Sequence, residues 1–87
     1  MPADPILALR KQTITAINAR LAYLAKLAGD EPPTRAELAA ELGLTRARLH
    51  QLENERASEF SLEALFRIAL SLDMSVRVKL ARPYSSA

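Results

Sequence analysis

The sequence contains no cysteine, no tryptophan and only two glycines, and it has no long apolar run. The absence of cysteine excludes disulfide bonds, thiolate zinc sites and thiol catalysis, and it fits a reducing compartment. No stretch reaches the roughly 18 uncharged apolar residues of a membrane helix, and the N-terminus lacks the pattern of a signal peptide. We therefore expect a cytoplasmic protein with no membrane partner.

Leucine, alanine and arginine are what the sequence has in abundance. With 49% hydrophobic and 25% charged residues, the 87-residue chain has the composition of one globular domain, and its leucine and alanine content favours helices. A domain this small buries a limited core, so we expect an oligomer. The net charge is only +2, but nine of the twelve basic residues are arginine, whose planar fork suits phosphate groups and guanine edges.

A long first helix is predicted over residues 5–28. Asp4 and Pro5 form a typical helix start, and Gly29 is a typical stop. Spacings of three and four residues give this helix one apolar stripe, at Ile14, Ile17, Leu21 and Leu24. We therefore interpret residues 1–28 as an N-terminal amphipathic helix that packs on the core.

Two short helices are predicted on either side of Gly43. Thr34 and Glu37 have the spacing of a capping box at the start of the first, and Thr45 can cap the second. Gly43 can take the left-handed conformation that ends a helix. The buried positions of this pair are expected at Leu38, Ala39, Leu42, Leu49 and Leu52.

A further helix begins after Ser61, which can cap it. The buried face of this helix is expected at Leu62, Leu65, Phe66, Ala69 and Leu72. Together with the pair around Gly43, it completes a helical domain over residues 33–73.

The segment that follows has an apolar period of two, and Pro83 closes it. A lone strand has no partner in its own chain, so residues 74–82 are predicted to pair with a second copy across a twofold axis. The alternative is a strand-like tail that packs on the helices or pairs with a turn. Residues 83–87 are expected to be disordered. The dimerisation residues of the homodimer would be Val76, Val78 and Leu80.

The helix after Thr45 has two unlike sides. Leu49 and Leu52 define its buried side on a helical wheel. The opposite side carries Ala47, His50, Gln51 and Asn54. Arg46 and Arg48 flank that side in the first turn, where a helix N-terminus favours anions. A helix presented in this way, and braced by another across a glycine corner, is a helix-turn-helix, which places side chains in the major groove of DNA.

The segment TRAELAAELGLTRARLHQLENE, residues 34–55, resembles the helix-turn-helix of the lambda-repressor-like XRE family. Members of that family commonly read T-Q-x-E-L-A, then a glycine, then a capped recognition helix ending L-E-N-G. The continuation ASEFSLEALFRIALSLDMSVRVKL is similar to single-domain HigA-type antitoxin regulators. The resemblance implies a mainly α, lambda-repressor-like bundle of four to five helices, with a C-terminal β-strand that pairs across a dimer.

The resemblance also implies residue roles. Base contacts are expected from Arg46, Ala47, His50 and Gln51, with Arg46 on guanine, Gln51 on adenine and Ala47 on a thymine methyl. Phosphate contacts are expected from Thr34, Arg35, Thr45, Arg48, Asn54 and Arg56. For Arg48, an ordinary solvated charge is an equal alternative.

Glu55 stands where the family usually has glycine. A left-handed Glu55 would cost about 1–2 kcal/mol, so two alternatives are open. Either Asn54 takes the left-handed role, or the recognition helix runs one residue longer.

The function that the resemblance implies is that of a sequence-specific transcriptional repressor. As a homodimer it would bind a palindromic operator in double-stranded DNA at the bacterial nucleoid. As a type II antitoxin it would also repress its own operon and neutralise a ribonuclease toxin, held on an amphipathic helix surface or on residues 1–13.

Two other functions stay open. One is a stand-alone or phage-type XRE regulator without a toxin. The other is a helical interaction module that does not bind DNA, which the acidic residues Glu53, Glu55 and Glu59 favour. We expect no enzyme, because no nucleophile is paired with a base, and no cofactor or metal, because His50 is the single histidine.

Overall fold

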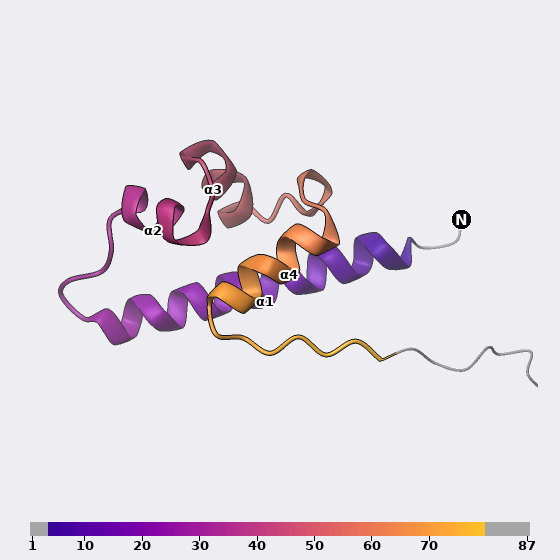
Figure 1. Cartoon of the computed structure of the whole chain (residues 1–87), viewed down its shortest axis with the longest axis horizontal. Helices are drawn as coiled ribbons and strands as arrows, with labels where there is room; N and C mark the ends of the chain where they lie inside the picture. Colours follow the sequence, from indigo (N-terminus) through magenta and orange to yellow (C-terminus); the bar gives the residue numbers. More distant parts are fainter. Residues whose placement is uncertain (1–3, 80–87) are drawn as a thin grey trace, which may run out of the picture.

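A computed structural model describes residues 4–79 of the chain. The described residues form four α-helices and one short 3-10 helix: α1 (Pro5–Ala28), α2 (Arg35–Leu42), α3 (Arg46–Glu53), η1 (Ala57–Glu59) and α4 (Leu62–Ser71). In Figure 1, α1 is a long rod, α4 lies against it, and α2 and α3 stand together on one side of the pair. Within residues 4–79 no helix is both long and apolar enough to cross a lipid bilayer.

Each α-helix begins at the residue that its sequence predicts. Thr34 Oγ1 accepts from the backbone N–H of Glu37, and Glu37 Oε1 accepts from the backbone N–H of Thr34, both at 3.1 Å. Side chains also accept from the first turns of the other three helices, at the caps Asp4, Thr45 and Ser61. These bonds satisfy N–H groups that a helix start leaves unpaired, and the four predicted caps are confirmed.

Three helices end with the same backbone geometry, in which a left-handed residue closes the last turn. The φ angle of this residue is 70° at Gly43, 53° at Glu55 and 59° at Asp73. Behind each, the next N–H bonds back five residues: Leu44 to Ala39, Arg56 to Gln51 and Met74 to Ala69. This is the Schellman arrangement, which glycine adopts without strain and which costs a residue with a Cβ about 1–2 kcal/mol.

The end of α3 therefore differs from both alternatives that the sequence left open. Asn54 is not left-handed, since its φ is −85° and its ψ is 10°, and α3 stops at Glu53. Glu55 itself takes the position of the family glycine. The backbone hydrogen bonds of the Schellman turn, together with a bond from α1 to the Glu55 carboxylate, offset the steric cost.

One hydrophobic core joins all the elements. Its buried members are Ile14, Ile17, Ala39, Leu42, Leu49, Leu52, Ala57, Phe60, Leu65, Ile68, Ala69 and Leu72. The prediction was wrong in detail for α4, because Phe66 and Leu62 are only half-buried while Ile68 is 4% exposed. The buried stripe of α4 is centred on Leu65 and Ile68, and this rotation leaves Phe66 at its edge, beside the segment that follows.

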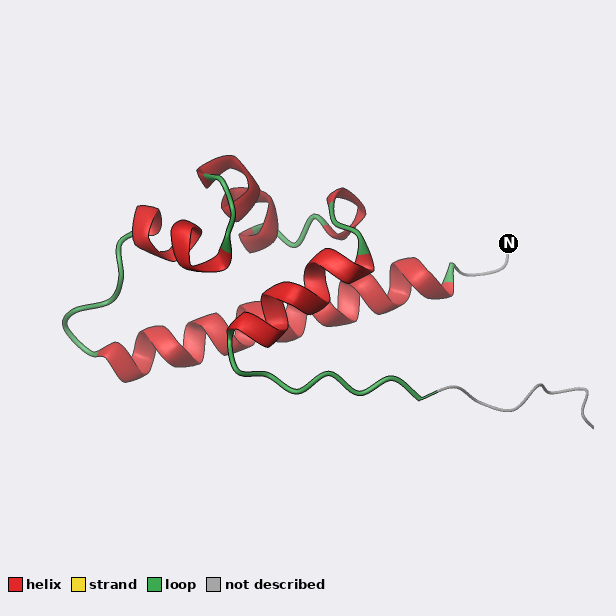
Figure 2. Cartoon of the chain, viewed as in Figure 1, coloured by secondary structure: helices red, strands yellow, loops and turns green. Residues whose placement is uncertain are grey.

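The segment after α4 forms no strand in the part that the structure describes, residues 74–79 (Figure 2). Met74 and Val76 pack on the core from outside, and Val78 is 57% exposed. Between this segment, α1 and α4 lies an open groove of about 400 Å³. A ladder across a dimer requires a second chain, so the strand and the homodimer stay predictions. Leu80 and the tail predicted to be disordered, 83–87, lie outside the described residues.

Candidate nucleic-acid interface

The turn between α2 and α3 sets the angle at which α3 is presented. Gly43 is left-handed, with φ 70° and ψ 30°, and Leu44 behind it is half-buried against the core. Thr45 then caps α3 at once, so only three residues separate the two helices. Leu49 and Leu52 on the inner side of α3 are both 0% exposed. Core packing on one side and a short corner on the other therefore hold α3 in a fixed orientation.

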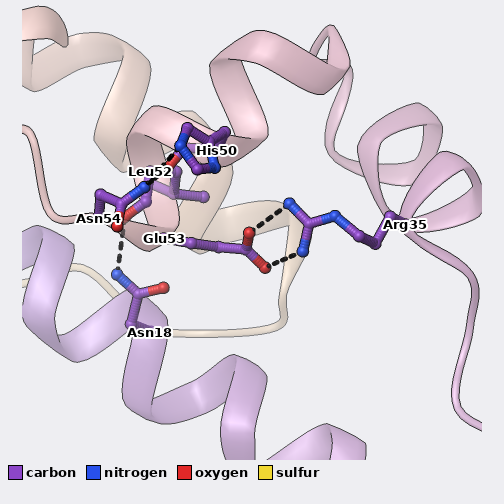
Figure 3. Close-up of polar contacts among 6 residues, drawn as sticks. All are labelled: Asn18, Arg35, His50, Leu52, Glu53 and Asn54. Atoms are coloured by element: carbon purple, nitrogen blue, oxygen red, sulfur yellow. Dashed lines mark hydrogen bonds and ion pairs between the residues drawn. The ribbon is translucent and has the colours of Figure 1, made fainter.

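Two side chains of α1 hold the C-terminal end of α3, and the sequence did not single out either. Asn18 Nδ2 donates to the carbonyl oxygen of Leu52 at 2.9 Å, as Figure 3 shows, and Thr15 Oγ1 donates to Glu55 Oε1 at 2.6 Å. The Leu52 carbonyl also accepts from the backbone N–H of Glu55, so Asn18 adds a second bond that joins α1 to the turn closing α3. These two bonds from α1 join residues more than thirty positions apart, which leaves no local pattern to reveal them.

The outer side of α3 exposes most of the residues expected to contact bases. Arg46, Ala47 and His50 are exposed, and Gln51 is half-buried. Ala47, His50 and Gln51 lie on the side of α3 opposite Leu49 and Leu52, and Arg46 flanks that side in the first turn, which agrees with the helical wheel.

His50 is bonded to Asn54, one turn further along the chain. Asn54 Nδ2 donates to the carbonyl oxygen of His50 at 2.9 Å and lies 3.0 Å from His50 Nε2. Figure 3 shows the two side chains next to each other at the C-terminal end of α3. The Asn54 amide therefore holds the His50 ring at this end of the helix.

The threonines at the starts of α2 and α3 each retain a donor. Thr34 Oγ1 and Thr45 Oγ1 use an acceptor lone pair for their caps, so the hydroxyl hydrogens are available to a phosphate oxygen. The capping bonds from Thr34 also lower the pKa of Glu37. Both helix N-termini, with their partial positive charge, therefore carry a hydroxyl donor.

Arg35 is held by an acidic residue of α3. Its Nη2 lies 2.5 Å from Glu53 Oε1, and its Nη1 lies 3.0 Å from Glu53 Oε2. Figure 3 shows the two planar groups facing each other across the gap between α2 and α3. Glu53 raises the pKa of Arg35, first through these hydrogen bonds and then through its charge. A bidentate pair of this kind joins the two helices and neutralises the Glu53 carboxylate.

Arg48, in the first turn of α3, and Arg56, just after the helix, have different surroundings. The Arg48 guanidinium lies 4.0 Å from the centre of the Phe60 ring, and its Nη1 donates to Gln51 Oε1 and to the carbonyl oxygen of Glu59. Arg48 is thus half-buried rather than an ordinary solvated charge. Arg56 is exposed just beyond the left-handed Glu55. The phosphate contacts expected from both arginines stay predictions.

A comparison with known protein families identifies the family of this chain. A family model described as a helix-turn-helix domain matches residues 6–81. This chain belongs to the helix-turn-helix family. The match takes in nearly all of α1 as well as the corner between α2 and α3, and it names neither the XRE nor the HigA-type group. Neither the curated proteins nor the solved structures gave a significant match.

Proposed function

We propose that this helix-turn-helix protein binds double-stranded DNA in a sequence-specific manner and regulates transcription as a repressor. The observation that carries the proposal is the contrast between the sides of α3. Leu49 and Leu52 are fully buried, while Arg46, Ala47 and His50 are exposed. A helix held in this way can enter a major groove without any change to the core.

Phosphate contacts would orient this helix on the duplex. The hydroxyl groups of Thr34 and Thr45 lie at two helix N-termini, and Arg35 stands in the first turn of α2. Such groups fix the register of a protein on DNA, while base contacts give the specificity. The pairing of Arg35 with Glu53 means that a phosphate would compete with a carboxylate for this guanidinium.

We include a homodimer in the proposal. The exposed Val78 and the lack of any ladder partner for residues 74–79 within the described chain support pairing with a second copy. Two recognition helices about 34 Å apart would then read the half-sites of a palindromic operator, one helical turn from each other.

The antitoxin role is the finer part of the proposal. It is supported by the resemblance to HigA-type regulators and by the exposed apolar side chains of α1, where Tyr23 and Leu27 are both more than half exposed. A toxin would cover this surface of α1. A stand-alone regulator remains the alternative, and the protein would act in either case by binding, without catalysis or a cofactor.

A titration of the DNA upstream of its own gene tests the main proposal. We expect log affinity to fall with log salt concentration at a slope near −0.9 for each phosphate neutralised. A competitor duplex of unrelated sequence should bind far more weakly. An absence of binding even at low salt would favour the interaction module that does not touch DNA.

Co-purification with the products of the adjacent genes tests the proposed antitoxin role. An antitoxin should form a stable complex with the product of an adjacent toxin-like reading frame, and Leu27→Glu should weaken that complex without changing DNA affinity. A regulator with no such neighbour would leave the stand-alone alternative in its place.

A further inference from the structure

We propose that Arg48 is a positioning residue that presents Gln51 to DNA as a hydrogen-bond donor, so that α3 selects guanine at the base position that Gln51 contacts. This differs from the adenine contact that the sequence predicts for Gln51. The inference rests on the proposed DNA binding. It adds which partner, Gln51 or the base, donates the hydrogen bond in one contact.

The first step is that Arg48 is not free to move. Its guanidinium lies over the Phe60 ring at 4.0 Å, and Phe60 is 2% exposed. Its Nη1 donates to the carbonyl oxygen of Glu59 at 2.7 Å. Stacking on an aromatic face and a bond to a backbone carbonyl together fix both the plane and the rotation of the guanidinium.

The second step is that Arg48 decides which end of the Gln51 amide faces it. The same Nη1 donates to Gln51 Oε1 at 2.9 Å, using its second hydrogen. Arginine has five donors and no acceptor, so a flipped amide would set N–H against N–H. The amide nitrogen Nε2 is therefore directed away from Arg48. Among the hydrogen bonds within residues 4–79, none uses Nε2 of Gln51.

The third step concerns the base edge. The two-bond contact of glutamine with adenine needs the amide oxygen to accept from N6 while the nitrogen donates to N7. In this protein one of the two lone pairs of the oxygen accepts a charge-assisted bond from Arg48, and this bond keeps the oxygen on the side of the amide that faces Arg48. The same bond polarises the amide and strengthens its N–H donors. The major-groove edge of guanine offers two neighbouring acceptors, N7 and O6, and so suits an amide nitrogen.

The test is selection of binding sites from a randomised duplex library by the full chain and its variants. Gln51→Ala identifies the base position, as the one whose preference it alone removes. We expect the unmodified protein to prefer guanine there on the order of tenfold. Replacing that guanine by 7-deazaguanine should weaken binding of the unmodified protein several-fold and leave Gln51→Ala unaffected.

Two substitutions separate positioning from charge. Gln51→Glu keeps the shape and the bond with Arg48 but has no donor, so it should lose the guanine preference. Arg48→Met keeps an apolar stem on Phe60 but releases the amide, and it should relax or shift the preference toward adenine at this position only. The preference at the Arg46 position serves as the internal control for folding. If Arg48 only bound phosphate, Arg48→Met would weaken all sequences equally and lower the salt slope by about one.

The outcomes distinguish this inference from the function on which it rests. Selection of adenine at the Gln51 position, unchanged by Arg48→Met, would overturn the inference and leave DNA binding intact. A protein that enriches no sequence at all would overturn the proposed function, and the inference with it.

Discussion

The inner and outer sides of α3 differ in what holds their side chains. On the inner side, Leu49 and Leu52 are 0% exposed and pack in the common core. On the outer side, Arg46 and Ala47 are exposed, and the His50 side chain contacts Asn54 of the same turn. The two sides of this eight-residue helix therefore have different roles. The inner side contributes to stability, and the outer side is available to contact a partner.

Three further residues of α3 are neither part of the buried inner side nor free of contacts with the rest of the protein. Arg48 joins the outer side to Phe60 and Glu59, Gln51 is bonded to Arg48, and Glu53 is bonded to Arg35 of α2. Arg48 and Glu53 thus connect α3 to neighbouring segments, and Gln51 is held through Arg48. Changes in these residues should therefore affect recognition and stability together, and the predictions below run from the largest expected effect to the smallest.

The inner side is tested by Leu52→Ala. Removing a fully buried leucine side chain should lower the free energy of unfolding by about 2–5 kcal/mol, because a cavity remains in the core. Denaturation in urea, followed by circular dichroism, measures this loss. DNA affinity of the folded fraction should change little. A loss below about 1 kcal/mol would mean that the buried Leu52 contributes little to the stability of the core.

The outer side is tested by Arg46→Ala. The substitution should cost about 1–3 kcal/mol of binding at one operator position, and should change the free energy of unfolding by less than about 0.5 kcal/mol. Arg67→Ala is the matched control, because Arg67 is an exposed arginine of α4 that pairs with Glu63 on the same helix. Equal losses on all DNA sequences would contradict a base-reading role for Arg46.

The contact between α1 and the left-handed Glu55 after α3 is tested by Thr15→Val. Loss of the bond from Thr15 to Glu55 should lower stability by about 0.5–1.5 kcal/mol. In a Glu55→Gly background the same substitution should cost almost nothing, because the carboxylate is absent and glycine is left-handed without strain. A double-mutant cycle on unfolding free energies measures the difference. Additive effects would show that Thr15 does not support the strained residue.

The pairing of Arg35 with Glu53 is tested by Glu53→Gln. Stability should change little, because solvent screens an exposed ion pair. Affinity should rise on every DNA sequence, because the substitution removes a negative charge from the interface and frees Arg35 for a phosphate. Titrations at two salt concentrations would check this. Unchanged affinity at low salt would exclude competition between Glu53 and phosphate.

The smallest effect concerns the cap of α2. The bonds from Thr34 lower the pKa of Glu37 in the folded chain below its value in the unfolded chain. The ionised carboxylate therefore stabilises the fold at neutral pH, and this contribution is lost as the pH falls through the lowered pKa. Thermal unfolding at a series of acidic pH values should show a shallower decline for Glu37→Gln. An identical decline would show that the capping box contributes no pH dependence.

Much of this architecture could be predicted because its signals are local. The caps at Thr34, Thr45 and Ser61 act over three residues, and Gly43 ends α2 by its own conformational freedom. The burial of Leu49 and Leu52 follows from helical spacing alone. The spacing was less decisive for α4, where apolar residues surround much of the helix and only packing against α1 separated Ile68 from Phe66.

What the sequence determined by itself is therefore the order of the helices, where each begins, and which residues of α3 share its outer side. Neighbouring positions suffice for these properties, because caps and helical faces depend on atoms within one or two turns. The tertiary structure alone decided the conformation of Glu55, the support of α3 by Asn18 and Thr15, and the contacts of Arg35 and Arg48. Each of these polar side chains is equally satisfied by water in an unfolded chain, and only the packing of distant helices brings it to its partner.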